Sequence, residues 1–509
     1  MPTLEELRKT RIQKLEALKA DHKNPYPSDP KRDFQIITVL NKFWLWQLTK
    51  KEFYLAGRIK SVRIHGQAAF FDLEDNSGKI QCFLSPADLT DKKSYDEFLV
   101  DYDIGDFVEI KGWIFKTKKG EKTVRIKEIR MIAKSLRPLP EKWHGLKDEE
   151  ERLRKRYLDM IANPEVKEIF IKKARYYQAM REFLQGKGFM EVETPALENT
   201  TGGADARPFV THHNALDMDV YLRISVGELW QKRLMVAGFE KTFEIGRIFR
   251  NEGMDAEHLQ DYTSMEFYWA YADWNDSMKL TEELVEHVAQ ETFGTLKFKI
   301  KNFEIDLGKK WERYDYCETI KKYTGVDIEE ICRDAIHGVS KDAIPKFVRW
   351  TNEGVSTIKK KLQELKVEYE DFNNLERGID NLWKYCRKNI AGPGFVVYLP
   401  KIISPLAKES KEKPGYTERY QLILAGSELC NGFSELNDPL DQEVRFKEQQ
   451  KLRDKGDEEA QMKDDDFIEA LKHGMPPTTG LGISERLFAF LMDKPMRECQ
   501  IFPLMRPRK

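Results

Sequence analysis

The sequence predicts an α+β protein with two domains, a small β-barrel followed by a larger domain in which helices alternate with strands. The chain has 509 residues, which is more than one hydrophobic core usually organises. In residues 53–134, short runs of alternating apolar and polar residues are separated by Gly and Asn-Ser-Gly turns. From residue 164 onward, helical stretches alternate with strands that Gly and Pro delimit. These two patterns predict the two domains.

The first 52 residues are predicted to form an N-terminal helical extension. Apolar residues recur at helical spacing among Lys, Arg and Glu, at Leu4, Leu7, Ile12, Leu15 and Leu18. This pattern is typical of an amphipathic helix, which the Asn-Pro-Tyr-Pro segment after residue 23 ends. We expect the helix to pack on its own domain, and a basic helix that also contacts RNA is the alternative.

The strands within residues 53–134 are typical of a small closed barrel of the OB type. The last hairpin is strongly basic and carries Lys111, Lys116, Lys118, Lys119, Lys122, Arg125, Lys127 and Arg130. Nearby strands carry Phe70, Phe71 and Phe83, so base stacking beside phosphate attraction is physically available. A charge run is usually only a solvated face, so both interpretations stay open on this pattern.

A Pro-rich hinge and a charged helical segment predict a linker at residues 135–163. Residues 164–509 form the predicted second domain, which is large enough to hold a deep active site. Within this domain, residues 325–393 have a mostly helical and highly charged pattern without catalytic spacing. We interpret them as a structural insertion.

Composition and charge exclude several functional classes. The formal net charge is -1, so any nucleic-acid site must be a local basic patch. No apolar run approaches the roughly 20 residues that span a bilayer, and the N-terminus lacks the apolar core of a signal peptide. We therefore expect a cytoplasmic protein with no membrane partner. The 6 cysteines lack Cys-x-x-Cys spacing and the 9 histidines form no ligand set, so a transition-metal enzyme is not expected.

Residues 241–271 predict a long antiparallel hairpin with a polar loop. On the returning strand, four side chains project from one face: Tyr262, Ser264, Glu266 and Tyr268. Arg250 lies where the outgoing strand meets the loop, and its guanidinium can bind phosphate or carboxylate oxygens through paired hydrogen bonds. A surface hairpin with ordinary salt bridges is the alternative for any single residue.

Two later segments combine small residues with charged ones. In residues 427–438, Glu428 could bind a hard cation such as Mg²⁺ with help from Asn431, although a capped turn would use the same residues. In residues 476–492, small residues precede Glu485, Arg486 and an apolar helix. The glycines permit close approach of a planar ligand whose phosphates Arg486 could face, but Gly-rich spacing alone is common.

Together, these segments resemble the signature motifs of class II aminoacyl-tRNA synthetases. GKGFMEVETPAL resembles motif 1, FRNE with the following His and MEFY resembles motif 2, and GLGISERL resembles motif 3. Nearly all of the chain, including the barrel, NGFSELND and the terminal FPLMRP, is similar to lysyl-tRNA synthetases. The resemblance implies a class II catalytic domain built on an antiparallel β-sheet flanked by helices, behind an OB-fold anticodon-binding domain.

The resemblance also implies a homodimeric enzyme of protein synthesis. Such enzymes condense lysine with ATP, release pyrophosphate, and transfer lysine to the 3′ end of tRNA(Lys), with Mg²⁺ as cofactor. The α-carboxylate of lysine is already ionised, so the first step needs no general base. It needs alignment and neutralisation of charge at the α-phosphate.

Arg250 resembles the motif 2 arginine that contacts the substrate carboxylate and the α-phosphate, and Arg486 the motif 3 arginine on the γ-phosphate. These two are the catalytic candidates. Further positions that match ATP-binding residues of the family are Glu252, His258, Tyr262 and Glu428. Tyr262 occupies the place of the aromatic ring that stacks on adenine.

Glu435 matches the carboxylate that selects the ε-ammonium of lysine, with Tyr268 as its hydrogen-bonding neighbour. Other matches to the lysine pocket are Gly203, Glu228, Glu266 and Asn431. A buried carboxylate that meets no cation is costly, so such a pocket rejects neutral side chains. In the barrel, the matches to anticodon-binding residues are Arg63, Phe70 and Gln81, with Arg58 as a nearby alternative to Arg63.

Three features depart from the family pattern. Gln421 stands where the family has a magnesium-binding carboxylate, which predicts fewer or weaker magnesium ions beside Glu428. Motif 3 is one residue shorter around Ser484, so we expect a bulge or an altered twist in its strand. One extra residue precedes Glu228, which leaves its reach to the pocket to be established.

Two other functions are compatible with parts of the sequence. An aspartyl- or asparaginyl-type ligase would share the fold, but its pocket needs an arginine or amide to meet a carboxylate or carboxamide, and its corresponding turn differs from NGFSELND. A tRNA-binding or regulatory protein with weakened catalysis would account for Gln421 and the short motif 3.

Overall fold

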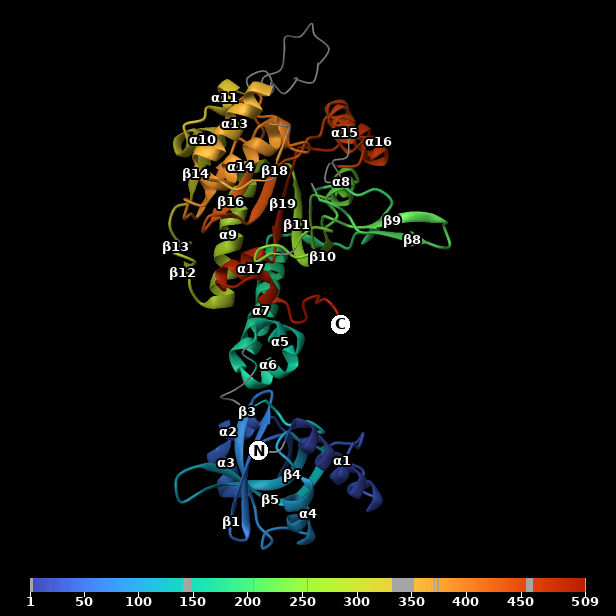
Figure 1. Cartoon of the computed structure of the whole chain (residues 1–509), viewed down its shortest axis with the longest axis vertical. Coiled ribbons are helices and arrows are strands. Elements are labelled where there is room, and N and C mark those ends of the chain that lie inside the picture. The colour runs from blue at the N-terminus through green and yellow to red at the C-terminus, as the bar shows by residue number, and fades with distance from the viewer. Residues whose placement is uncertain are drawn as a thin grey trace. The chain divides into compact units, whose positions relative to one another are not determined.

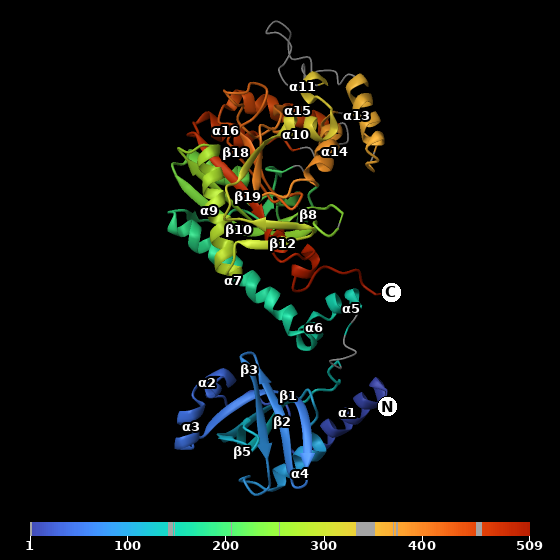
Figure 2. The ribbon, with the colours of Figure 1, turned by 90° about the vertical axis from the view of Figure 1, so that its left-hand side faces the viewer.

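The computed structural model describes residues 3–140, 146, 148–204, 206–253, 255–331, 352–369, 371–372, 375–454 and 461–508. The chain divides into two compact units, Met1–Ala162 and Asn163–Lys509 (Figures 1 and 2). Parts of the predicted linker at 135–163 and of the predicted insertion at 325–393 lie outside the described residues.

Five strands of the first unit close into a barrel in the order β1-β2-β3-β5-β4, which confirms the predicted OB-type fold. The strands are β1 (Phe53–His65), β2 (Ala68–Asp75), β3 (Gly78–Leu84), β4 (Phe107–Lys116) and β5 (Lys122–Ala133). Alternate residues of β1 face inward, and Phe53, Leu55 and Ile59 are buried in the barrel core. The period of two in the sequence therefore translates directly into an inner and an outer face.

Short helices pack around the barrel. They are α2 (Ile36–Asn41), α3 (Phe43–Thr49) and α4 (Lys93–Asp101). Two further helices, α5 (Glu149–Arg154) and α6 (Arg156–Ala162), end the unit and contribute none of their described residues to the barrel core. Phe43 and Trp46 of α3 and Phe98 of α4 belong to the same hydrophobic cluster as the barrel interior. Helices α3 and α4 thus extend the core of the barrel instead of forming one of their own.

The N-terminal helix α1 (Leu4–Ala20) begins at a capping box formed by Thr3 and Glu6. It packs on its own unit, as predicted, through the buried side chain of Arg11. The Arg11 guanidinium donates hydrogen bonds to the carbonyl oxygens of Ile104 at 2.9 Å and Ser135 at 3.1 Å. These buried hydrogen bonds hold the helix against the barrel.

The second unit is organised around a large sheet in the order β14-β15-β16-β18-β19-β11-β10-β6, with β17 beside β16. The pairs β14–β15 and β10–β6 run parallel and the others antiparallel. In sheet order the strands are Glu312–Asp315, Gly394–Val397, Arg419–Leu424, Cys430–Ser434, Thr478–Ser484, Asp261–Ala270, Lys241–Phe249 and Met190–Glu191, and β17 is Ser427–Glu428. The predicted hairpin of residues 241–271 is β10 and β11, which lie toward one end of this sheet, with β10 beside the edge strand β6.

Two long helices pack together and bury the apolar side of the sheet. Helix α9 (Trp274–Phe293) contacts β16, β18 and β19, and α7 (Pro164–Gly186) packs along α9. Their buried residues, among them Tyr176, Leu284 and Val288, form one cluster with β11 and β19. The short helix α8 (Glu228–Val236) contacts β11 and β10, and α17 (Arg486–Leu491) follows β19.

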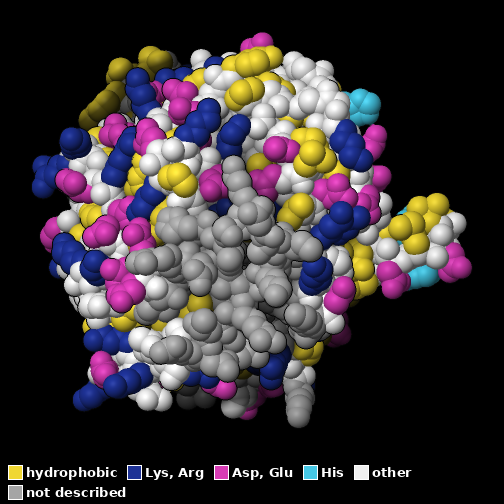
Figure 3. Space-filling model, turned by 90° about the horizontal axis from the view of Figure 1, so that it is seen from above, with side chains coloured by type: hydrophobic (Ala, Val, Ile, Leu, Met, Phe, Trp, Pro, Cys, Tyr) yellow, Lys and Arg dark blue, Asp and Glu magenta, His cyan; other side chains and the backbone are white. Residues whose placement is uncertain are grey.

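Smaller elements surround this centre. One helical group contains α10 (Tyr316–Thr324), α11 (Ile328–Ile331), α13 (Asn352–Glu364) and α14 (Leu375–Arg387), and another contains α15 (Pro439–Asp454) and α16 (Asp465–Lys472). Two small sheets complete the unit: β12 (Lys297–Ile300) with β13 (Phe303–Asp306), and β7 (Leu197–Glu198) with β8 (Val210–His213) and β9 (Met218–Leu222). The β8–β9 hairpin projects from the unit and is the arm with histidine side chains in Figure 3.

The strand that carries the shortened third motif pairs in an unbroken register. Along β19, Thr478 to Ser484 oppose Ala270 to Ser264 of β11 one for one, and β18 pairs continuously on the other side. The expected bulge is therefore absent from this strand, and the alternative, an altered twist, stays a prediction. The strand ends at Ser484, and α17 begins two residues later at Arg486.

Among the described residues, no helix combines the length and the apolar character that a membrane crossing requires.

Candidate active site

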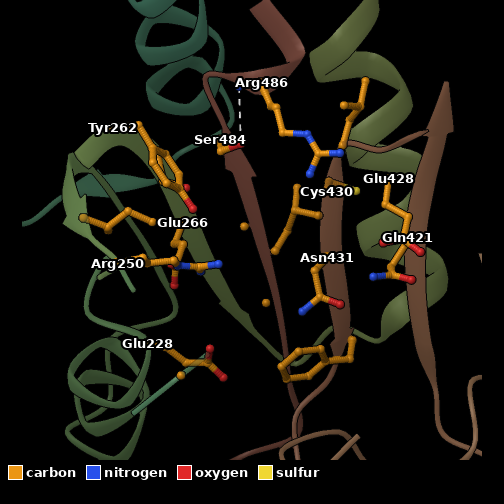
Figure 4. A pocket seen from close by; sticks show the side chains of 18 of the residues that line it. Glu228, Arg250, Tyr262, Glu266, Gln421, Glu428, Cys430, Asn431, Ser484 and Arg486 are labelled. Atoms are coloured by element: carbon orange, nitrogen blue, oxygen red, sulfur yellow. Dashed lines mark hydrogen bonds between the residues drawn. The ribbon is translucent and has the colours of Figure 1, made fainter. Parts of the chain in front are cut away.

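A cavity of about 270 Å³ opens over β11, β18 and β19 of the second unit. The strands meet here because β11 and β18 both pair with β19. All of the site residues predicted in this unit except Glu252 line the cavity: Gly203, Glu228, Arg250, His258, Tyr262, Glu266, Tyr268, Gln421, Glu428, Asn431, Glu435 and Arg486. Figure 4 shows that Arg486 and Glu228 lie at opposite ends of this group.

The floor of the cavity depends on the period-two pattern of β11 and on glycines of β19. Tyr262, Glu266 and Tyr268 point from one face of β11 into the cavity, as predicted. Gly480 lies opposite Tyr268, and a β-carbon there would stand 2.5 Å from Glu435 Oε1 and 2.6 Å from the Tyr268 ring. Only glycine therefore allows Glu435 and Tyr268 to approach each other across this strand.

Glu266 is buried and held by two donors. The Val226 N–H donates to its Oε1 at 2.7 Å, and the Tyr268 hydroxyl donates to its Oε2 at 3.1 Å. Burial, reinforced by the charge of Glu228, raises the pKa of Glu266 to about 7. The sequence predicted Tyr268 as the hydrogen-bonding neighbour of Glu435, and this was wrong. Tyr268 binds Glu266 instead, because both residues stand on β11, two positions apart on one face.

Glu435 follows β18 and is 1% exposed. The ammonium of Lys232 lies 2.5 Å from its Oε2, and its Oε1 has no hydrogen-bond partner among the described residues. Burial raises the pKa of Glu435 to about 8, against the opposing effect of Lys232. A carboxylate with one open, desolvated oxygen is suited to receive a cation.

Glu228 reaches the cavity in spite of the extra residue that precedes it. Gly227 immediately before α8 has a φ of 68°, in the left-handed region, and a β-carbon there would lie 2.1 Å from Thr194 Oγ1. This turn directs the first residue of α8 into the site. Gly203 packs against it, since an added β-carbon would lie 2.7 Å from Glu228 Cβ.

Arg250 and Tyr262 stand at the side of the cavity where the β10–β11 loop begins (Figure 4). The Arg250 guanidinium lies 5.9 Å from the centre of the Tyr262 ring, and its Nε donates to the Ile224 carbonyl at 3.3 Å. In the loop, His258 Nδ1 lies 2.8 Å from a carboxylate oxygen of Asp255. Glu252 is exposed and does not line the cavity, so the loop brings only His258 of these two predicted residues to the site.

Arg486 stands at the far end of the cavity, at the start of α17. Its Nη2 lies 2.9 Å from Glu257 Oε2, and Glu257 also accepts hydrogen bonds from Lys301 at 2.8 Å and Ser427 at 3.0 Å. Three donors outweigh the burial of Glu257 and lower its pKa. The guanidinium at this end is thus paired with a carboxylate of the motif 2 loop.

Gln421 and Glu428 lie side by side near Arg486 (Figure 4). Gln421 is on β16 and Glu428 is on the neighbouring β17, where it opposes Ile423. The Trp383 indole N–H donates to Glu428 Oε1. Asn431 on β18 accepts a hydrogen bond at 2.8 Å from Arg419, which orients its amide in the cavity.

The barrel of the first unit holds a second cavity of about 1090 Å³. Arg63, Phe70 and Gln81 all line it, whereas Arg58 does not and instead stacks over Phe107 at 4.3 Å. The same cavity is lined by aromatic and basic side chains that include Phe83, Phe115, Lys118, Lys119, Lys122 and Arg125. Rings beside cations in one concavity are suited to single-stranded nucleic acid.

Comparison with known proteins assigns both units. The family described as tRNA synthetases class II (D, K and N) matches residues 148–506, and the OB-fold nucleic acid binding domain matches residues 53–135. A lysine–tRNA ligase of Thermotoga maritima is 44% identical over 99% of this chain and 97% of its own length. Lysine–tRNA ligases of Clostridium tetani and Carboxydothermus hydrogenoformans are 45% and 44% identical, over 98% and 99% of this chain and 95% and 99% of their own lengths.

This chain belongs to the lysine–tRNA ligase family of class II tRNA synthetases. The family is an ATP-dependent one, and its fold is the OB barrel with the large sheet described above.

Two residues of the site, Lys232 and Glu257, were not predicted from the sequence. Lys232 contacts both Glu228 and Glu435, and its spacing of four residues from Glu228 on a helix was a usable signal. Glu257 directly precedes His258, but nothing in the local sequence indicates that it pairs with Arg486. Their partners come from distant strands and turns.

Proposed function

We propose that this protein activates lysine with ATP and then transfers the lysyl group to the 3′ end of tRNA(Lys). The observation that carries the proposal is Glu435, a buried carboxylate with one unpartnered oxygen at the end of the cavity away from Arg486. A desolvated carboxylate selects a cationic side chain over a neutral one, because a neutral ligand leaves it without a partner. The relatives, which cover almost the whole chain, are named lysine–tRNA ligases.

In the lysine subsite, Glu435 would bind the ε-ammonium. Glu266 and Glu228, the latter packed against Gly203, would bind the α-ammonium, and Asn431 would offer a further polar contact. Tyr268 would act through Glu266, whose oxygen it already holds. Because Glu435 and the pair Glu266 and Glu228 bind different ammonium groups of lysine, the pocket would select the length of the ligand's side chain as well as its charge.

Activation joins a carboxylate oxygen of lysine to the α-phosphorus of ATP and breaks the bond to the departing pyrophosphate. Both reactants are anionic, so the protein must align them and neutralise their charges. Arg250 lies between the acids of the lysine subsite and Tyr262, where it can bind the lysine carboxylate and an α-phosphate oxygen together. No proton needs to be removed in this step.

In the ATP subsite, Tyr262 would stack on the adenine, with His258 of the same loop near the nucleotide. Arg486 would bind the terminal phosphate and, like Arg250, would assist the departure of pyrophosphate. The phosphate must first displace Glu257 from Arg486, because both anions need the same guanidinium.

Mg²⁺ is the metal that we expect with ATP. Glu428 and Gln421 fit it, because a carboxylate and an amide oxygen from adjacent strands face the same end of the cavity. When bound there, the ion would neutralise phosphate charge. With only one carboxylate in this pair, we expect fewer or weaker ions than a two-carboxylate site holds.

In the second step, a hydroxyl of the terminal ribose attacks the lysyl carbonyl carbon and AMP departs. The tRNA would be recognised at its anticodon by the barrel cavity, where Phe70 stacks on a base and Gln81 and Arg63 form polar contacts. We assign residues 53–134 to this anticodon-binding domain, 1–52 to the helical extension, 135–163 to the linker and 164–509 to the catalytic domain, with 325–393 as its insertion.

We further propose a cytoplasmic homodimer. Residues around the first motif expose large apolar side chains, with Ile171, Met190 and Leu197 each about half exposed at 51%, 45% and 49%. Apolar surface of this kind is typical of a subunit interface. Light scattering coupled to gel filtration should give twice the chain mass of 59.8 kDa, and a monomer at micromolar concentration would contradict the proposal.

ATP–pyrophosphate exchange with each of the twenty amino acids tests the function. We expect exchange with lysine alone, followed by charging of tRNA(Lys). Exchange with aspartate or asparagine, and none with lysine, would overturn the assignment. Binding of tRNA without exchange for any amino acid would instead favour a regulatory protein with weakened catalysis.

A further inference from the structure

The ammonium of Lys232 lies inside the wall of the amino-acid pocket. Lys232 stands one turn after Glu228 on α8 and is 1% exposed. Its Nζ lies 2.7 Å from Glu228 Oε1 and 2.5 Å from Glu435 Oε2. It thus joins a carboxylate on a helix to a carboxylate that follows a strand of the central sheet.

The side chains that surround this ammonium are carboxylates and aromatic rings from several elements. Glu228 comes from α8, Glu435 follows β18, and β11 contributes Glu266 and Tyr268 nearby. Ring centres of Phe433, Phe467 and Tyr268 lie 5.3, 5.9 and 6.0 Å from the ammonium. Burial disfavours its charged form, but the two bound carboxylates outweigh burial and raise the pKa of Lys232, so it is cationic at neutral pH.

The pocket is balanced in charge only when Lys232 is counted. The amino-acid end holds three acidic side chains, Glu228, Glu266 and Glu435, and two basic ones, Lys232 and Arg250. Their ionised forms leave one net negative charge, which equals the net positive charge of free lysine at neutral pH. Without Lys232 these side chains would carry two net negative charges. One buried carboxylate would then lack a counter-charge after lysine has bound.

Lys232 also leaves half of Glu435 available. It contacts Oε2, whereas Oε1 has no hydrogen-bond partner among the described residues and lies next to Gly480, where no side chain occupies the space beside it. An incoming ammonium can therefore approach Oε1 while Lys232 holds the other oxygen. The contact with Lys232 restrains Oε2 of Glu435 before any ligand arrives, and the contact with Glu228 holds the Lys232 ammonium in place.

We propose that Lys232 is a positioning residue that sets the amino-acid specificity of the pocket, by holding Glu435 and Glu228 and matching the pocket to one side-chain ammonium. The inference rests on the proposed function, since it takes the cavity to be the amino-acid site. It goes further by assigning the selection of lysine to a carboxylate–lysine–carboxylate unit instead of to Glu435 alone. The ligands that fit are α-amino acids with a single cationic side chain.

The test is calorimetric titration of the full chain with L-lysine between pH 6 and pH 9, in pairs of buffers that differ in ionisation enthalpy. The number of protons released on binding is obtained together with Kd. Lys232→Met removes the ammonium and keeps a flexible apolar stem among the three rings. Glu228→Gln and the double variant complete a cycle. Lys241→Met is the matched control, because Lys241 also lies over aromatic rings but its ammonium donates to the Lys187 carbonyl, outside the cavity.

For Lys232→Met we expect the Kd for lysine at pH 7 to rise by at least about tenfold, with more protons released, because an uncompensated buried carboxylate must lose a proton to bind. The Kd of Lys232→Met for ATP should equal that of the parent. The control variant Lys241→Met should keep the parent's Kd for lysine. The losses caused by Lys232→Met and Glu228→Gln should not add, since the double variant removes one charge of each sign.

Unchanged proton release in Lys232→Met, or strictly additive losses, would overturn the proposal and leave Lys232 a packing residue. If Lys232→Met does not fold, folding of the double variant supports the charge-matching role, and misfolding of both contradicts it. If the unaltered chain does not bind lysine at all, the proposed function fails instead. The two ideas are therefore separately testable.

Discussion

The Arg486 guanidinium lies 2.9 Å from the Glu257 carboxylate, although the two residues are 229 positions apart in the chain. Glu257 belongs to the loop between β10 and β11, and Arg486 begins α17 at the end of β19. The pair brings an acid of motif 2 to the arginine that we assign to the terminal phosphate of ATP. Any anion that binds Arg486 must compete with this carboxylate.

Neutralising that carboxylate should therefore strengthen ATP binding. For Glu257→Gln we expect the KM for ATP to fall by roughly three- to tenfold, the range for one partly buried ion pair, with the KM for lysine unchanged. Steady-state ATP–pyrophosphate exchange measures both constants. The matched control is Glu283→Gln, which breaks an ion pair with Lys187 outside the cavity. A higher KM for ATP would show that Glu257 assists the nucleotide.

Removing the charge of Glu435 should impair lysine recognition alone. In Glu435→Gln the KM for lysine should rise by about 10- to 200-fold, as expected for loss of one charged hydrogen bond at a buried site. The KM for ATP should stay within twofold of the parent value, because the nucleotide binds at the other end of the cavity. Equal losses for lysine and ATP would contradict the assigned role.

Lysine binding should depend more on the absence of a side chain at Gly480 than at Gly482, which lies two positions further along the same strand. A β-carbon at Gly480 would lie 2.5 Å from Glu435 Oε1, whereas at Gly482 the nearest atom would be 3.4 Å away. We expect Gly480→Ala to raise the KM for lysine by about tenfold or more, since a methyl group would meet the oxygen meant for the ammonium. Gly482→Ala is the comparison variant and should raise the KM for lysine less than Gly480→Ala, because its added methyl group would be in ordinary van der Waals contact with the Glu266 side chain. Similar kinetics for the two variants would mean that this part of the cavity is not the ammonium site.

Lysine binding should weaken as the pH falls through neutrality. Burial raises the pKa of Glu266 to about 7 and that of Glu435 to about 8 in the empty pocket. Below these values, protons occupy the carboxylates and compete with the ammonium groups of lysine. The Kd for lysine should therefore rise by up to about tenfold per pH unit below pH 7 for each competing proton. A Kd that is flat from pH 6 to pH 9 would contradict this linkage.

The same shifts predict how lysine affects thermal stability. The folded pKa values of Glu266 and Glu435 exceed the ordinary 4.5, so the folded protein holds protons that the unfolded chain has already released. The stability of the empty protein should fall as the pH rises from about 5 to about 8. Lysine supplies the missing positive charge, so the rise in Tm that it causes should be larger at pH 8.5 than at pH 6. Scanning calorimetry measures this difference, and the reverse order would refute it.

Recognition of tRNA should depend on Arg63 and not on Arg58. Both lie on β1, but only Arg63 lines the barrel cavity, while Arg58 stacks on Phe107. For Arg63→Gln we expect the KM for tRNA to rise by about 3- to 30-fold, which corresponds to one or two polar contacts. Lysine activation without tRNA should be unaffected. Arg58→Gln should leave the KM for tRNA unchanged, and a larger effect at Arg58 would reverse the assignment.

Local patterns predicted much of this fold because local geometry decides them. The period of two in β11 alone places Tyr262, Glu266 and Tyr268 on one face, since successive side chains of a strand point to opposite sides. The same rule predicted the inner face of the barrel. The motifs, through their resemblance to a family, then supplied the candidate residues, and all of them in the second unit except Glu252 line one cavity.

Only the tertiary structure decided which of these side chains contact one another. Lys232 and Glu435 meet because α8 packs on β11 beside β19 and β18, and Glu257 meets Arg486 because a loop folds over the end of β19. Tyr268, by contrast, binds Glu266 through a local contact, because the two residues stand two positions apart on one face of β11. The sequence by itself determined the periodicity, the turns and the kinds of chemical group in the site. Charge pairing between distant residues depends on how strands and helices assemble, which no local pattern records.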